Sequence, residues 1–79
     1  MIPIIEYRLL TNLWKSYEKF LCKQKSYTVP RVGETVNIDG EPYITHNIGY
    51  AISSDDNQMY VYVTVISPYG TGAKKETDD

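Results

Sequence analysis

Residues 35–44 read Thr-Val-Asn-Ile-Asp-Gly-Glu-Pro-Tyr-Ile, two short segments of alternating character on either side of Asp39-Gly40. Asp-Gly supplies the positive φ angles that a two-residue type I′ turn requires, and this turn matches the twist of the strands that it joins. The segment therefore predicts a tight β-hairpin, with one strand at 35–38 and a second beginning at Tyr43.

Two long strands are expected after this turn. In residues 43–52 the even positions, from Ile44 to Ile52, are largely apolar, which predicts a half-buried strand with its even side chains facing the core. In residues 59–66 both alternate sets are apolar or aromatic, which predicts a strand at the centre of the sheet or beneath a second layer. The polar residues 53–57 form the loop between them.

The first third of the chain leaves two alternatives open. Residues 2–10 predict a strand, and Pro3 suits its start or a sheet edge because proline lacks an amide donor. Between Leu10 and Leu21 the apolar residues recur at spacings of three and four, which predicts a short helix within 10–22. The competing interpretation is a second strand over 17–28 that follows an irregular loop.

The segment 29–44 begins Val-Pro-Arg-Val-Gly-Glu and continues through a short strand, an Asp-Gly turn and a Tyr-containing strand. Over 29–66 the chain resembles small, mostly uncharacterised SH3-like barrel proteins of bacteria and their phages. The resemblance implies a strand before the Pro-Arg-Val-Gly-Glu run and carries no active site. Pro30 holds Val29 extended, and Gly33 permits a sharp entry into the next strand, so the local physics agrees.

These features predict a mainly β fold, a small SH3-like barrel of about five antiparallel strands over residues 1–70, with residues 71–79 as a disordered tail. The chain has 79 residues, a net charge of −2 and one cysteine. One domain without an internal disulfide fits a reducing bacterial cytoplasm. No apolar run approaches the roughly 20 residues of a membrane helix, so we expect no membrane partner.

Charge is unevenly distributed. Residues 1–27 hold five Lys and Arg against two Glu, whereas residues 28–70 hold one Arg against five Asp and Glu. The weakly acidic whole argues against duplex DNA, because binding duplex DNA relies on many phosphate-neutralising side chains. The basic first third could attract a small anion or an acidic partner. A solvated, lysine-rich face is the simpler interpretation.

Little in the sequence supports catalysis. His46, between Ile44 and Ile48, is interpreted as a hydrogen-bonded core histidine. Nearby lysines could activate Cys22, but we interpret it as a small apolar filler. One His, one Cys and scattered carboxylates do not supply a metal site, and the dispersed glycines form no phosphate-binding loop. We therefore expect neither an enzyme nor a cofactor.

Aromatic residues are the unusual feature, at 13% of the chain with eight Tyr. Tyr60 and Tyr62 share one face of the last strand, opposite its valines, so burial of one face cannot account for both. That face is either covered by the N-terminal segment through Trp14 and Tyr17, or an interface for a partner or second subunit, or a platform on which bases stack while nearby cations hold phosphate.

The candidate binding residues combine these aromatic side chains with the nearest cations: Trp14, Tyr17, Tyr60, Tyr62, Arg8, Lys23, Lys25 and Arg31. The leading hypothesis is a non-catalytic binding module, an accessory protein of a phage or mobile element that docks on or inhibits a bacterial partner protein through its Tyr/Trp face. The alternatives are an oligomeric sponge for an anionic signalling nucleotide and a weak single-stranded nucleic-acid binder.

Overall fold

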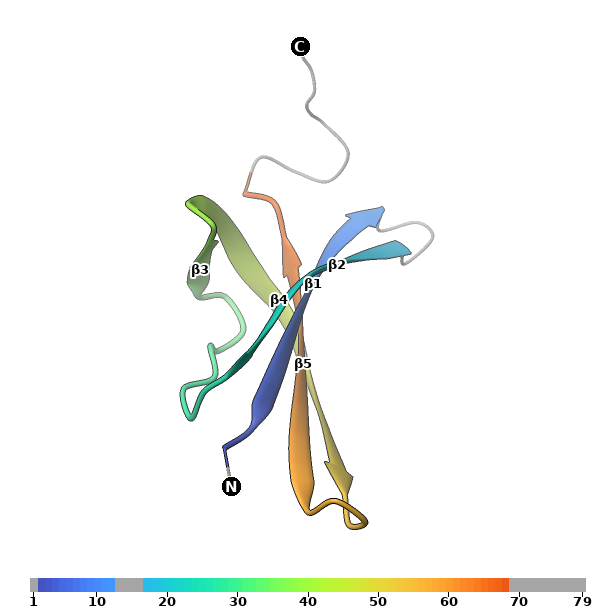
Figure 1. The fold of residues 1–79 in the computed structure, drawn as a ribbon. Helices are drawn as coiled ribbons and strands as arrows, with labels where there is room; N and C mark the ends of the chain where they lie inside the picture. The colour runs from blue at the N-terminus through green and yellow to red at the C-terminus, as the bar shows by residue number, and fades with distance from the viewer. Residues whose placement is uncertain (1, 13–16, 69–79) are drawn as a thin grey trace.

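The structure is a computed structural model, and it describes residues 2–12 and 17–68. Five strands form one sheet: β1 (Ile4–Asn12), β2 (Tyr17–Lys25), β3 (Thr35–Ile38), β4 (Glu41–Ser53) and β5 (Gln58–Ile66). Their spatial order is β2-β1-β5-β4-β3. The sheet twists strongly and curls into a half-barrel (Figure 1), which confirms the mainly β, SH3-like architecture. The predicted tail lies outside the described residues.

The direction of one strand pair differs from the prediction. β1 and β5 run parallel, with Ile5 opposite Val61 and Tyr7 opposite Val63, whereas the other neighbouring pairs are antiparallel. The expectation of an antiparallel sheet throughout is therefore wrong. Side-chain alternation shows which residues share a face, but it does not say in which direction a neighbouring strand runs.

The segment within 10–22 forms strands in its described part, so of the two alternatives the second strand, expected over 17–28, is confirmed as β2 and the helix is wrong. Residues 10–12 belong to β1 and residues 17–22 to β2, while 13–16 lie outside the described residues. A bulge makes Leu21 an extra residue of β2. Leu21 and its neighbour Cys22 consequently both pack against the core. The bulge removes the strict alternation that would have marked a strand in the sequence.

The Asp39-Gly40 turn forms as predicted. The φ angles of these two residues are 52° and 83°, both positive as a type I′ turn requires. β3 pairs with residues 41–44 of β4. Beyond β3, the amide of Gly33 donates to the carbonyl of Thr45 at 2.9 Å, and the amide of Thr45 donates to the carbonyl of Glu34 at 2.8 Å. The edge of β4 on this side is thus paired as far as Thr45.

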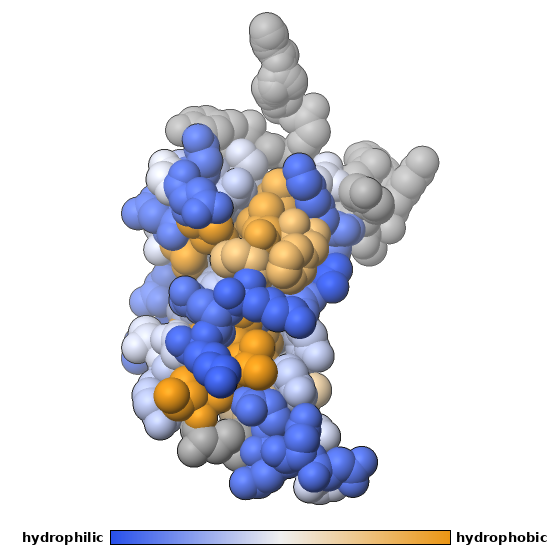
Figure 2. Space-filling model, in the orientation of Figure 1, coloured by the Kyte–Doolittle hydropathy of each residue, from blue (hydrophilic) through white to orange (hydrophobic). Residues whose placement is uncertain are grey.

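The core lies on the inner face of the curled sheet. Its buried cluster comes from the two parallel strands: Ile5, Tyr7, Val61, Val63 and Val65. β5 lies between β1 and β4, which confirms that this strand is central. On the side seen in Figure 2, apolar atoms appear in separate areas bordered by hydrophilic residues.

The alternation predicted for β4 fails at a bulge. His46 is the extra residue there, so Thr45 is buried and His46 is exposed. The interpretation of His46 as a core histidine is therefore wrong. Past the bulge, Ile48, Tyr50 and Ile52 lie opposite inward-facing residues of β5, yet Tyr50 and Ile52 are 64% and 74% exposed because the half-barrel does not cover this end of the hairpin.

A substitution at Thr45 tests how much an unpaired hydroxyl in the core destabilises the protein. Its Oγ1 is buried without a hydrogen-bond partner among the described residues, and an unsatisfied buried hydroxyl is destabilising. We expect Thr45→Val to raise the free energy of unfolding by about 1 kcal/mol, measured by urea denaturation. In the matched variant Thr64→Val, which loses a hydroxyl that donates to Glu18, stability should not rise. Equal effects of the two substitutions would contradict this account.

Candidate outer-face binding site

The outer face of the sheet, the side opposite the core, gathers most of the predicted binding residues. Tyr62 of β5 lies beside Glu6 of β1, which in turn lies opposite Lys23 of β2. The adjacent cross-strand row repeats the pattern with Tyr60, Ile4 and Lys25. Because neighbouring strands lie roughly 4.8 Å apart, each tyrosine and lysine of a row are separated by about 10 Å at the backbone.

This face is open around Tyr62. Tyr62 belongs to the central strand, yet it is 41% exposed. Its neighbour on β4 is Gly49, and a Cβ atom added at Gly49 would meet no atom within 4 Å. Among the described residues, nothing covers Tyr62 fully, and the predicted covering residue Trp14 lies outside them.

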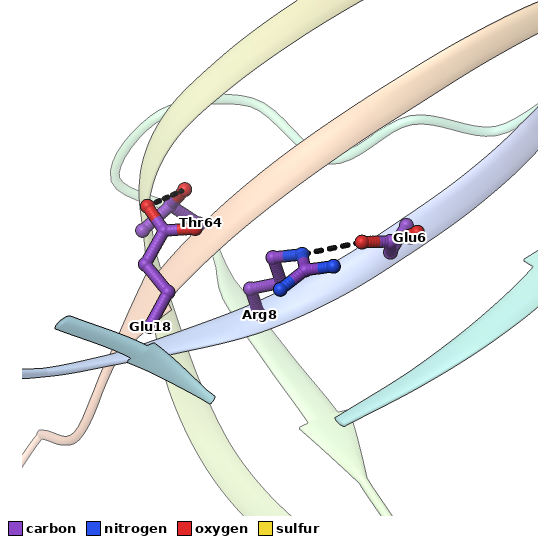
Figure 3. Close-up of polar contacts among 4 residues, drawn as sticks. All are labelled: Glu6, Arg8, Glu18 and Thr64. Atoms are coloured by element: carbon purple, nitrogen blue, oxygen red, sulfur yellow. Dashed lines mark hydrogen bonds and ion pairs between the residues drawn. The ribbon is translucent and has the colours of Figure 1, made fainter. Parts of the chain in front are cut away.

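Arg8 is held in place on this face. Its Nε donates to the Glu6 carboxylate, forming an ion pair (Figure 3). Its guanidinium carbon lies 5.9 Å from the ring centre of Phe20, within cation–π range. The Glu6 side chain is 12% exposed and that of Arg8 is 40% exposed. The Glu6 carboxylate is therefore paired within the protein, whereas part of the Arg8 guanidinium remains at the surface.

The second acidic side chain of the face also has a partner. Glu18 reaches from β2 across β1 and accepts a hydrogen bond of 3.4 Å from the Thr64 hydroxyl of β5 (Figure 3). Lys23 and Lys25, by contrast, have no ion-pair partner among the described residues. Within the described residues, the outer face thus carries two ammonium groups without an ion-pair partner, each in a cross-strand row with a tyrosine.

Tyr60 has a carboxylate partner at the rim of the face. Its hydroxyl donates to Asp56 Oδ2 at 3.1 Å. This hydrogen bond, with smaller contributions from desolvation and from the charge of Asp56, raises the pKa of Tyr60 above its ordinary value of 10.0. The phenol therefore stays protonated to a higher pH than an ordinary tyrosine does.

The Tyr60 pKa predicts behaviour in alkali. A tyrosine whose folded pKa is raised contributes stability that is present below pH 10.0 and is lost as the pH rises through the folded pKa. We expect Asp56→Asn to lower the pKa of Tyr60 toward 10.0, followed through its ring signals in an NMR titration. Tyr60→Phe identifies the signals. An unchanged midpoint in Asp56→Asn would show that the carboxylate does not hold the proton.

The inner side of the sheet carries a small pocket between the strands at its two edges. Tyr7, Cys22 and Gln24 line one wall, and residues 36–39 line the other. Burial, and secondarily the negative charge of Asp39, raises the pKa of the Cys22 thiol. A protonated thiol is a poor nucleophile, and Cys22 packs against the core, as expected of a filler.

The remaining predicted residues lie elsewhere. Arg31 is exposed in the turn before β3, where its backbone amide donates to Glu34 Oε1 at 2.8 Å. Tyr17 begins β2, but its side chain, like Trp14, lies outside what the structure describes. The structure thus brings together Tyr60, Tyr62, Arg8, Lys23 and Lys25. Sequence analysis missed Phe20, because recognising its outward direction requires knowledge of the bulge at Leu21.

No three His, Cys, Asp or Glu side chains within 2–12 and 17–68 are placed to hold a metal ion. The described part of the chain has no helix long and apolar enough to cross a bilayer. Comparison of the chain with protein-family models, curated proteins and solved structures found no match. What the protein does must therefore follow from its own residues.

Proposed function

We propose that the protein is a non-catalytic binding module whose outer face docks on a bacterial partner protein, in the manner of an accessory or inhibitory protein of a phage or mobile element acting in the host cytoplasm. One observation carries the proposal. The inner side of β5 is completely buried at Val61 and Val65, while Tyr62 between them is 41% exposed on the other side. Core packing therefore does not require a tyrosine there.

The chemistry of the face suits a protein surface. Tyrosine and arginine are common anchors at interfaces because each combines a flat apolar area with a polar end. Arg8 is already held by Glu6 and lies over Phe20, so less side-chain entropy is lost when a partner binds. The pocket lies on the inner side, away from these residues.

Two substitutions test the docking face in opposite ways. Tyr62→Ala removes a contact, and Gly49→Gln adds a side chain in open space beside Tyr62. With tagged protein as bait in bacterial extract, we expect wild type to capture a partner. Titration of that partner should show each variant binding at least 30-fold more weakly, which corresponds to a hot-spot loss of about 2 kcal/mol.

The matched control is Tyr27→Ala, which removes a tyrosine that is 73% exposed in the loop after β2 and should bind as wild type does. Circular dichroism and thermal melting report on folding. If Tyr62→Ala unfolds the chain, Tyr62 is a structural residue and the proposal is wrong. Retention of the partner by both outer-face variants would reject it as well.

The two Tyr–Lys rows favour single-stranded nucleic acid as a second candidate, because bases stack on tyrosine while ammonium groups bind phosphate. If two lysines bind phosphate, the logarithm of the association constant should fall with the logarithm of salt concentration at a slope of roughly −1.4. Lys23→Gln should reduce this slope by about half. Lys19→Gln is the control, because Lys19 lies opposite Leu9, which is beside the inward-facing Val65, and so is not on the outer face. Salt-independent or absent oligonucleotide binding contradicts this candidate.

The nucleotide-sponge hypothesis stays a prediction with its own requirement. A ligand that binds only the folded state raises the melting temperature, and at 100 times its dissociation constant it adds about 2.7 kcal/mol of stability. One class of nucleotide should therefore raise the melting temperature by several degrees. A panel of nucleotides without effect would remove this alternative.

A further inference from the structure

β4 has an open edge. The strand is 13 residues long, but β3 pairs only with residues 41–44, and two further backbone hydrogen bonds reach Thr45. Among the described residues, 47–53 are paired with β5 alone, and the hairpin that they form with β5 extends beyond β3 (Figure 1). This length of backbone therefore offers amides and carbonyls to another strand.

The exposed edges of β2 and of residues 47–53 in β4 differ in how well they are protected against pairing with another strand. β2, at the opposite side of the sheet, carries Lys19, Lys23 and Lys25, and edge lysines oppose pairing with another strand. Residues 47–53 read Asn-Ile-Gly-Tyr-Ala-Ile-Ser, without a charge or a proline. The open edge of β4 beyond the bulge at His46 therefore lacks the charges and prolines that oppose strand addition.

Large apolar side chains lie along this same edge strand. Tyr50 and Ile52 are 64% and 74% exposed. They lie opposite Val61 and Met59 of β5 and so share one side of the sheet. Exposed apolar side chains on an unprotected strand edge mark a place of association.

We propose that residues 47–53 pair antiparallel with the same residues of a second copy of this chain, so that one sheet runs through both copies. A two-fold interface must be complementary to itself, and an uncharged segment meets its own copy without repulsion. With the axis at Tyr50, the two Tyr50 side chains face each other and Ile48 faces Ile52 of the second copy. On the other side of the sheet the small residues Gly49 and Ala51 face each other.

This pairing does not depend on the function proposed above. The edge of β4 and the outer face of β5 adjoin at Gly49, opposite Tyr62, so Tyr62→Ala, which leaves residues 47–53 unchanged, is the variant that separates docking from pairing. Antiparallel pairing keeps the outer faces of both copies on the same side of the continuous sheet. A dimer would therefore present two Tyr62 surfaces together, which increases avidity for a partner with repeated binding sites.

Light scattering during size-exclusion chromatography of the full chain tests the proposal. We expect wild type, at micromolar to millimolar concentration, to approach twice the 9.1 kDa mass of one chain. The double variant Tyr50→Lys with Ile52→Lys should remain at 9.1 kDa with an unchanged circular dichroism spectrum, since both side chains are exposed. The control Tyr27→Lys should still dimerise. A monomeric wild type, or a dimeric double variant, overturns the proposal.

Disulfide cross-linking tests the register. In a Cys22→Ser background, Tyr50→Cys should give a covalent dimer on oxidation, because directly opposed residues of an antiparallel pair lie close enough for a disulfide. Ile52→Cys should not cross-link with its own copy, since position 52 faces position 48. Cross-linking through Ile52→Cys, with none through Tyr50→Cys, would overturn pairing about Tyr50.

Discussion

The parallel pairing of β1 with β5 is the constraint on which the rest of the structure depends. It places Ile5 and Tyr7 beside Val61 and Val63, and these residues form most of the buried cluster. Two segments from opposite ends of the chain thereby become the centre of the sheet. β2 and β3 are left at its edges, and every surface available for binding follows from this arrangement.

With two different faces, the central strand β5 supplies core packing on one side and the proposed binding surface on the other. The inner side chains of β5 fill the half-barrel. Its outer side chains are therefore not needed for core packing and are available for contact with another molecule. The polar groups on the outer side are partly organised in advance, since Glu6 holds Arg8 and Glu18 accepts from Thr64. Such organisation limits the entropy lost on binding and gives the face a defined chemistry, aromatic and cationic.

The edges of the sheet show a second division of roles. Lysines protect β2 against strand addition, whereas β3 is only four residues long and leaves the later part of β4 unpaired. The short β3 follows from the tight turn at Asp39-Gly40 on one side and the turn at Gly33 on the other, both with positive φ. Local turn chemistry thus decides how much of β4 can meet another strand.

The sequence alone determined the features that depend on near neighbours. Asp39-Gly40 specifies its turn because only certain residues accept two positive φ angles, and the alternation in β5 separates its valines from Tyr60 and Tyr62. Only the tertiary structure decided the parallel direction of β1, the bulges at Leu21 and His46, and the exposure of Tyr50. Each of these depends on which distant strand lies alongside. Hydrogen bonding between strands far apart in the chain does not alter the apolar–polar alternation of either sequence, so that alternation does not predict it.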